Sequence, residues 1–364
     1  MGYEELASRL LSVGKEHLSA CIGIDGFIDR ILRVVDQRLD AFHATYIQTL
    51  HDYGQRISSA SSLSLNMEIV PELSKYGGNG PIMAGALASL GCGVSCIGAL
   101  GYPDLAEEFL PLREMASLYS FAQPAITDSY EFTDGKLISS MLDSLNTLHW
   151  ERISSRVGMP TLLQLFEQSD LIAVNNWTMI PAMTQIWVHL QEEVFPKLSR
   201  RRRILFFDLA DPSKRAATDL QEMQRVLQKF SSFGSVVLSC NQREADLLAM
   251  AVGMDPNAFP PLSLCRQLRQ AMGIYCVSIH TLQNAYASSE DADGTAEGFF
   301  TPSPRISVGG GDHFNAGFAF SLLHHFPLPN ALTLGRAVSG YYVRTGSSPS
   351  LDELAAFLTE SVPG

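Results

Sequence analysis

A glycine-rich segment late in the chain carries the residue types that phosphate chemistry needs. In VGGGDHFNAGF, Gly309, Gly310 and Gly311 precede Asp312, and apolar residues recur at helical spacing from His313 onward. The first turn of a helix leaves backbone N–H groups unpaired, and glycines allow a phosphate to approach them closely. The pattern therefore predicts an anion site beside one carboxylate. The alternative is that Asp312 only caps the helix and the glycines only form a turn.

A second glycine cluster lies in the first third of the chain. In YGGNGPIMAGALASLG, Gly77, Gly78 and Gly80 flank Asn79 ahead of a predicted helix. The spacing matches neither the dinucleotide fingerprint G-x-G-x-x-G nor a Walker loop, because no G-K-[ST] follows. It favours a place where the backbone comes close to a polar ligand, with a simple tight turn as the alternative.

A third motif, SCNQREADLL, follows a predicted strand. Asn241 closes the apolar run, and Glu244 lies three residues later in the first turn of the next predicted helix. This spacing is typical of a capping box, in which the two side chains satisfy each other's backbone N–H groups. The functional alternative is that both residues hold water around a Mg²⁺ ion on nucleotide phosphates, since Mg²⁺ keeps several of its waters.

The elements that must position these motifs alternate between strands and helices. Short, continuous apolar runs predict strands within residues 20–29, 94–101, 171–177, 203–211, 235–241 and 275–281, with helices at 181–198, 220–229, 242–250 and 262–272. Such strands are buried on both faces, which predicts a parallel sheet covered by helices. Ligands of parallel sheets bind at the carboxyl ends of the strands. The polar residues that close these runs are therefore candidates: Asp25, Asn175, Asp208, Asn241 and His280.

One segment interrupts the alternation. SYEFTDGKLISSML contains an Asp134-Gly135 turn between strand-like runs, which predicts a β-hairpin. Together with residues 119–130 it would form a small β-flap beside the main sheet. Lys136 in this hairpin and Asn176 in the segment NNWT are two further residues that could face a cleft, although an ordinary turn and an ordinary core also explain them.

Composition limits the class of protein. With 364 residues, 46% hydrophobic and 18% charged, the chain is expected to fold as one large α/β domain or two domains. A net charge of −12 disfavours a nucleic-acid partner. The absence from the sequence of a long uncharged apolar run disfavours a membrane span, so we expect a cytoplasmic protein. Six cysteines without a C-x-x-C pair are interpreted as buried, reduced thiols, and the run from Arg200 to Arg203 as a solvated helix end, with an anion site as the alternative.

Taken together, the motifs resemble those of the ribokinase-like (phosphofructokinase-B type) carbohydrate kinases. The family's Gly-Gly motif matches Gly77-Gly78, its Asn-x-x-Glu motif matches residues 241–244, and its Gly-x-Gly-Asp motif matches residues 309–312. The segment DPSKR at 211–215 is similar to the family's D-P-N-x-R. The resemblance covers roughly residues 20 to 350, and the order and spacing of the motifs make it specific.

The resemblance implies a fold. It would be a single ribokinase-like kinase domain over residues 1–364, an α/β three-layer sandwich with a mostly parallel central sheet. A small β-lid would be formed by segments near 25–45 and 119–145. The lid would also be the surface for a partner, a second copy of the chain.

The resemblance also implies an activity: ATP-dependent phosphorylation of a hydroxyl on a sugar or related small polyol. Asp312 would be the general base, and Gly309, Gly310 and Gly311 the anion hole for the transferred phosphoryl group. The other implied site residues are Asp25, Asp29, Gly78 and Asn79 for the substrate, Asn241 and His280 for the nucleotide, and Glu244, through water, for the metal. The implied cofactors are ATP and Mg²⁺, and the implied partner is the small-molecule substrate, with no nucleic acid and no membrane.

Besides Ser213, which stands where the family's D-P-N-x-R has Asn, three positions depart from the family pattern. Ile306 and Ser307 stand where the family usually has Asp-Thr, which puts a monovalent-cation site in doubt, and Ile82 stands where it usually has a substrate-binding Asn. The acceptor sugar therefore cannot be carried over from a named member. A nucleoside kinase and a catalytically silent sugar- or nucleotide-binding relative remain as alternatives. A Rossmann-type oxidoreductase is disfavoured, because GIDGFID after the first strand lacks the glycine fingerprint.

Overall fold

A nine-stranded sheet forms the centre of the molecule. The computed structural model describes residues 2–13 and 16–360. Its strands are β1 (Ser19–Gly23), β5 (Gly93–Gly98), β6 (Ser117–Ser120), β9 (Leu171–Val174), β10 (Ile204–Asp208), β11 (Ser235–Asn241), β12 (Cys276–His280), β13 (Asn284–Ser289) and β14 (Asp293–Glu297). They follow the order β14-β13-β12-β11-β10-β9-β1-β5-β6, and only the β12-β13 and β13-β14 pairings within it are antiparallel. The predicted, mostly parallel sheet is confirmed.

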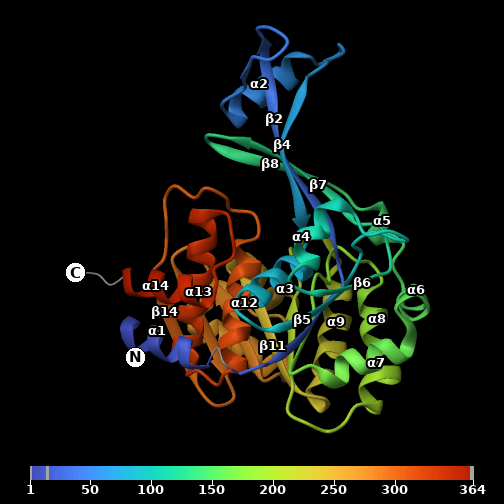
Figure 1. The fold of residues 1–364 in the computed structure, drawn as a ribbon, viewed down its shortest axis with the longest axis vertical. Coiled ribbons are helices and arrows are strands. Elements are labelled where there is room, and N and C mark those ends of the chain that lie inside the picture. Colours follow the sequence, from blue (N-terminus) through green and yellow to red (C-terminus); the bar gives the residue numbers. More distant parts are fainter. Residues whose placement is uncertain (1, 14–15, 361–364) are drawn as a thin grey trace.

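Helices cover both faces of this sheet (Figure 1). One layer contains α1 (Tyr3–Val13), α3 (Asn79–Ser89), α12 (Gly310–Leu323), α13 (Leu328–Thr345) and α14 (Leu351–Glu360); the other contains α7 (Met159–Gln168), α8 (Met183–His189), α9 (Ala217–Lys229), α10 (Gln242–Ala251) and α11 (Pro261–Met272). Alternate residues of one strand serve the two layers: in β10, Phe206 packs with the first and Phe207 with the second. The three-layer sandwich is therefore confirmed.

The predicted helices agree with the observed ones to within about three residues, except at the carboxyl end of one of them. The helix expected over 181–198 is α-helical only in α8, and continues as a π turn over Leu190–Val194 and a 3₁₀ turn over Phe195–Lys197. Pro196 lies in that last turn and cannot donate a helical backbone hydrogen bond, which accounts for the irregular end. The short helices α4 (Leu110–Arg113), α5 (Asp143–Asn146) and α6 (Trp150–Ile153) complete the body.

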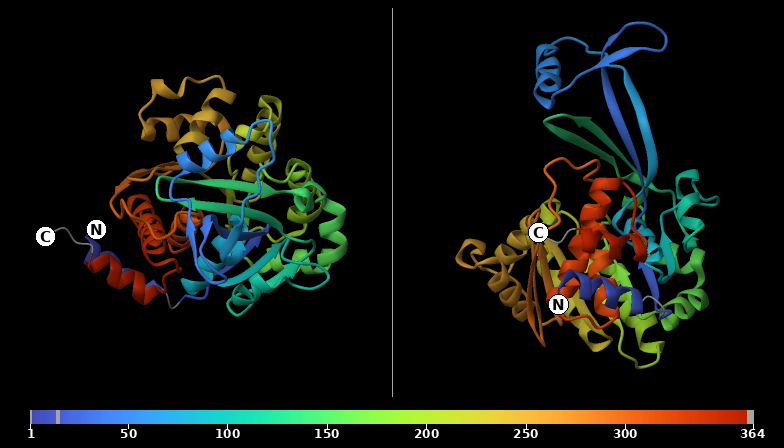
Figure 2. Two further views of the ribbon diagram at one scale, coloured as in Figure 1. Left: turned by 90° about the horizontal axis from the view of Figure 1, so that it is seen from above. Right: turned by 60° about the vertical axis from the view of Figure 1, so that its left-hand side comes forward.

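A second, five-stranded sheet stands away from the body, as both views show (Figures 1 and 2). It consists of β2 (Phe27–Arg38), β3 (Ala44–Tyr46), β4 (Ile69–Gly77), β7 (Ala125–Phe132) and β8 (Gly135–Met141), and helix α2 (Leu50–Ser59) lies beside it. We call this sheet the lid. β7 and β8 form the hairpin predicted at Asp134-Gly135, with Phe132 paired to Gly135. The segments predicted for the lid lie near 25–45 and 119–145; the sheet also contains β4, from residues 69–77.

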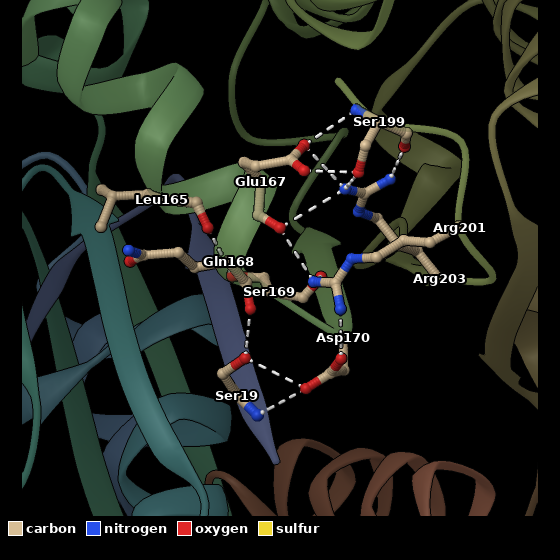
Figure 3. A network of polar contacts seen from close by, with 9 residues as sticks. All are labelled: Ser19, Leu165, Glu167, Gln168, Ser169, Asp170, Ser199, Arg201 and Arg203. Carbon is tan, nitrogen blue, oxygen red and sulfur yellow. Dashed lines mark hydrogen bonds and ion pairs between the residues drawn. The ribbon is translucent and has the colours of Figure 1, made fainter.

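The arginine run comes directly before β10, at the amino end of the central sheet, and Figure 3 shows the contacts of Arg201 and Arg203. Arg201 donates a 2.7 Å hydrogen bond to Asp170, and the buried Arg203 bonds the Glu167 carboxylate and the backbone carbonyl of Ser199. These contacts tie the end of α7 to the start of β10. The interpretation as a solvated helix end is therefore wrong for Arg203, which is buried, whereas Arg200, Arg201 and Arg202 are exposed.

Two other sequence expectations can be checked in the fold. All six cysteines are buried free thiols, as predicted. Within residues 2–13 and 16–360, no helix is both long enough and apolar enough to cross a membrane.

Candidate active site

The polar residues that close the central strands meet at one edge of the sheet. Asp208, Asn241 and His280 end β10, β11 and β12, which are neighbours in the sheet. Asp25 and Asn175 follow β1 and β9, which are neighbours in turn. Because carboxyl ends of parallel strands share an edge, residues far apart in the sequence form one site.

Asp25 connects this edge to the second glycine cluster. It is completely buried and accepts hydrogen bonds from the backbone N–H groups of Asn79 and Gly80, both at 2.8 Å, and from Nδ2 of Asn176 at 2.7 Å. Gly78 makes this approach possible: its φ is +97°, and an added Cβ would lie 2.9 Å from the Asp25 carboxylate. Burial raises the pKa of Asp25 to about 6, while its hydrogen-bond donors oppose that rise. The carboxylate therefore anchors the first turn of α3, so the cluster is more than a tight turn.

The anchored Asn79 reaches across to the third glycine segment. Its Nδ2 donates a 2.8 Å hydrogen bond to Oδ1 of Asp312, 233 positions later in the chain. Asp312 lies in the first turn of α12 with 8% of its surface exposed, and the N-cap of that helix, Gly309, makes no side-chain capping hydrogen bond. Asp312 is therefore turned toward the other glycine motif, and the interpretation as a simple helix cap does not account for its position.

The glycines before Asp312 keep the start of α12 open. Gly309 has a φ of +90°, where other residues are strained, and an added Cβ would lie 3.2 Å from Ile82. At Gly311 an added Cβ would meet only the His280 ring, at 3.5 Å, which is an ordinary contact. All three glycines are partly exposed. The helix start thus presents backbone N–H groups to an anion, and that of Gly310 makes only a long hydrogen bond, 3.4 Å, to the Ser307 carbonyl.

Several carboxylates surround Asp312. Burial raises its pKa well above the usual range, and the nearby Asp208 and Asp25 raise it further, whereas the hydrogen bond from Asn79 lowers it. Asp208 in turn accepts a 2.6 Å hydrogen bond from Nδ2 of Asn315, one helical turn after Asp312. A carboxylate in this setting is a stronger base than one in water.

We expect Asp208→Asn to move the acidic limb of the pH profile of kcat/KM to lower pH. The resemblance implies that Asp312 acts as a general base, which requires it to be deprotonated. The negative charge of Asp208 opposes that deprotonation, so removing the charge lowers the pKa of Asp312. The other charged or titratable groups that interact with Asp312 stay in place: Asp25, Asp29, Lys75, Glu244 and Tyr342.

The fold has room for this substitution, because the Oδ1 atom of Asn315 is buried without a hydrogen-bond partner among the described residues and can accept from the new amide. The matched control is Asp352→Asn, at an exposed aspartate in α14. A limb that stays in place in Asp208→Asn would show that Asp208 does not set the basicity of Asp312.

The Asn241-Glu244 motif forms the capping box that its spacing predicts. Oδ1 of Asn241 accepts from the N–H of Glu244 at 3.0 Å, and Oε2 of Glu244 accepts from the N–H of Asn241 at 2.8 Å. Burial and the nearby Asp208 raise the pKa of Glu244 well above its usual range. The capping contact leaves Oε1 of Glu244 outside the box, so capping and metal-water binding are compatible.

A pocket of about 320 Å³ adjoins these residues and the glycines. Its lining includes Asn241, His280, Gly310, Gly311, Phe299 and Phe300. The His280 ring packs 4.7 Å from the Phe314 ring, and burial lowers the pKa of His280 to about 4, so this histidine is neutral at pH 7. The pocket combines apolar walls with a rim of backbone N–H groups.

Some residues of this site were not singled out for it from the sequence. Lys75 in β4 donates a 2.8 Å hydrogen bond to the hydroxyl of Tyr342, and Asn315 bonds Asp208. The place of Asn315 can be recognised in retrospect. It lies three residues after Asp312 on the same helix, so the two side chains share one helix face. Lys75 carries no comparable signal, because IVPELSKYG does not alternate between apolar and polar residues as a half-buried strand does. Asp29, expected near the substrate, lies buried on β2 directly opposite Lys75, and burial raises its pKa to about 6.

Comparisons with known proteins agree with this geometry. The model of the prokaryotic ketohexokinase family matches residues 11–361. A ketohexokinase of Haloferax volcanii is 31% identical over 342 residues, which are 92% of this chain and 89% of that protein.

Solved structures share the fold at low identity. A fructokinase with bound ATP from Xylella fastidiosa has a TM-score of 0.64 at 17% identity, over 95% of this chain and 99% of its own. A ribokinase from Thermotoga maritima has a TM-score of 0.61 at 17% identity, over 94% and 99%. The extent of the family match and of the Haloferax alignment shows that this chain belongs to the prokaryotic ketohexokinase family, a group of ribokinase-like carbohydrate kinases.

Proposed function

We propose that the protein transfers the γ-phosphoryl group of ATP to a hydroxyl of a ketohexose. Asp312 takes the proton of that hydroxyl, and the N–H groups at Gly309, Gly310 and Gly311 stabilise the charge on the transferred group. The observation that carries this proposal is the hydrogen bond between Asn79 and Asp312, because it joins the two glycine motifs around one buried base. The ketohexose is inferred from the similarity to the Haloferax ketohexokinase.

The sugar would lie between the lid and the start of α3. Asn79, Gly78 and Asp29 line that side, and amide and carboxylate groups suit a polyol because each forms several hydrogen bonds. Asp25 has three donors from the protein itself, so its part is to hold Asn79 and the first turn of α3 in place. Ile82 stands where the family usually has an asparagine, and it is buried beside Gly309. Because its side chain is apolar, Asn79 would supply the hydrogen bonds to the sugar instead.

The nucleotide would occupy the pocket beside Asn241 and His280, with its phosphates toward Gly310 and Gly311. The Glu244 carboxylate, with Asp208 and Asp211 nearby, offers oxygen ligands of the kind that Mg²⁺ prefers, and Mg²⁺ retains several waters. When bound, Mg²⁺ would supply positive charge to the phosphates of ATP.

The decisive test is ATP consumption with a panel of acceptors. Fructose and other ketohexoses, aldohexoses, ribose and adenosine are compared at equal concentration, and the phosphorylated product is identified by mass spectrometry. We expect the highest kcat/KM with a ketohexose. Faster turnover of adenosine would favour the nucleoside kinase, and sugar binding without any turnover would favour the silent relative.

We further propose that two copies associate through the lid. Leu73 of β4 and Ile138 of β8 lie on the same face of the lid sheet and are 47% and 48% exposed. The lid projects beyond the body (Figure 2), so a second lid could cover this strip by two-fold symmetry. Sedimentation should give a dimer that Ile138→Asp converts to monomer, while Leu282→Asp, at an exposed residue outside the lid, should not. A wild-type monomer at micromolar concentration would contradict this.

A further inference from the structure

The arginine run lines a pocket at the amino end of the central sheet. This pocket has a volume of about 720 Å³, and its lining includes Arg200 to Arg203, Ser199 and Ser232. Among the described residues, no carboxylate belongs to the lining. We call it the arginine pocket. It is positively charged, although the chain as a whole has a net charge of −12.

The arginine pocket is separate from the candidate active site. Arg203 directly precedes β10, and Asp208 ends the same strand in the active site. Gly234, which also lines the pocket, directly precedes β11, and that strand ends at Asn241. The two sites therefore lie at opposite edges of the sheet, about 17 Å apart along a strand of five residues.

Two of the four arginines have no partner for their charge. The other two pair with Asp170 and Glu167, which lie outside the pocket lining (Figure 3). In the part of the chain that the structure describes, the side chains of Arg200 and Arg202 make no hydrogen bond or ion pair, and both residues are exposed. Two guanidinium groups at this pocket are thus available to a ligand.

Arg203 adds a positive charge that is buried and incompletely hydrogen-bonded. It is 3% exposed, and its Nε atom has no hydrogen-bond partner among the described residues. Burial and the neighbouring Arg201 lower the pKa of Arg203, while Glu167 opposes that shift. An anion in the pocket would offset the repulsion between these two guanidinium groups.

The chemistry and the size of the pocket favour a small ligand that carries phosphate. A guanidinium group can bind two phosphate oxygens at once, and two arginines supply the charge that matches a phosphate dianion. The volume lies within the range of about 300 to 1,000 Å³ that is typical of small-molecule sites. The Ser232 hydroxyl donates to the carbonyl of Lys229 at 2.8 Å, so its oxygen can still accept a hydrogen bond from a ligand hydroxyl.

A nucleic acid matches the pocket less well than a small ligand does. A nucleic acid carries a charge on every phosphate of its backbone and is bound by cations spread along a surface. Here the cations are four adjacent residues around one recess of an acidic protein.

We propose that the arginine pocket is a second ligand site, in which Arg200 and Arg202 bind the phosphate group of a small molecule. That group is common to inorganic phosphate and to the phosphate ester of a sugar. The inference does not depend on the proposed kinase activity, although a sugar phosphate is also the class of product that this activity would form.

Chemical modification of arginines tests the site on the full-length protein. Phenylglyoxal modifies exposed guanidinium groups, and mass spectrometry of peptides gives the rate at each arginine. We expect glucose 6-phosphate, at twice its dissociation constant, to slow the modification of Arg200 and Arg202 about threefold. Arg113, an exposed arginine of α4 that likewise has no hydrogen bond or ion pair among the described residues, should react at an unchanged rate.

Inorganic phosphate, tested at the same concentration, distinguishes the two sources of the phosphate group. Stronger protection by glucose 6-phosphate would show that the pocket also binds the sugar, and equal protection that it binds the phosphate group alone; either result supports the site. Potassium chloride at equal ionic strength should not protect. Absence of protection, equal protection of Arg113, or protection by a single-stranded oligonucleotide alone would overturn the proposal.

A double variant separates the pocket from the kinase site. Arg200→Gln combined with Arg202→Gln removes both unpaired charges and breaks no internal contact, so the protein should fold and keep the wild-type kcat. Calorimetric titration should show an affinity for glucose 6-phosphate at least about tenfold lower, the cost of one lost hydrogen bond between charged groups. Arg113→Gln is the matched control. A double variant with unchanged affinity would overturn this inference and leave the proposed function standing, whereas a wild-type protein that binds glucose 6-phosphate here but phosphorylates no acceptor would do the reverse.

Discussion

Asp312→Asn should lower kcat by about a thousandfold while sugar and ATP still bind. The amide matches the carboxylate in shape, and its oxygen can still accept the hydrogen bond from Asn79, but it cannot take a proton from the attacking hydroxyl. The expected loss is that of a general base, within the range of about 10² to 10⁴. Steady-state kinetics measure the loss in kcat, and calorimetric titration measures the two dissociation constants.

Two comparisons make this result specific. Asp352→Asn, the same substitution at an exposed position of α14, should retain the wild-type rate. The variant should also bind sugar at least as well as the wild type at neutral pH, because it removes one of several neighbouring negative charges. A variant with most of the wild-type kcat would show that another group accepts the proton.

Gly311→Ala should reduce kcat by about a hundredfold without unfolding the protein. The new methyl group would lie 3.5 Å from the His280 ring, an ordinary contact, so the fold can accept it. It would nevertheless project from the first turn of α12, where, in the proposed mechanism, the transferred phosphoryl group approaches the backbone N–H groups. Losing one such hydrogen bond costs about 10² to 10³ in rate in comparable anion holes.

The control for Gly311→Ala is a glycine with similar space but no proposed ligand. At Gly93, the start of β5, an added Cβ has its nearest neighbour at 3.9 Å, so Gly93→Ala should change neither kcat nor the melting temperature much. Circular dichroism and thermal melting verify the fold of both variants. A Gly311→Ala enzyme that is folded and fully active would remove these amides from the mechanism.

The central sheet could be predicted from the sequence because its strands carry a local signal. Runs such as LIAV in β9 and ILFFD in β10 are apolar on both faces; the second ends in Asp208, and the first is followed directly by Asn175. Of the motifs that carry the resemblance, Asn241 to Glu244 lies at such a strand end, Gly77-Gly78 lies at the end of β4, and Gly309 to Asp312 begins α12. Local patterns therefore position Asp208, Asn241 and Asp312 without knowledge of long-range contacts.

The lid could be predicted only in part, because its strands depend on their partners. β4 reads IVPELSKYG, with a proline and charged residues typical of exposed structure, and it becomes a strand through antiparallel pairing with β2. Its role in carrying Lys75 was hidden for the same reason. The contact of Lys136 with Ser307 joins residues 171 positions apart, and no local pattern encodes such a distance.

The lid is covalently continuous with both ends of the proposed sugar site. β2 begins two residues after Asp25, and β4 ends at Gly77, two residues before Asn79. Any ligand that fixes these two strand ends also limits how the sheet beyond them can pivot. By thermodynamic reciprocity, a lid that is restrained from outside in the ligand-bound arrangement binds that ligand more tightly. An association of two lids would thus change the affinity for the substrate. The effect would be transmitted through two rigid β-strands and would need no separate effector pocket.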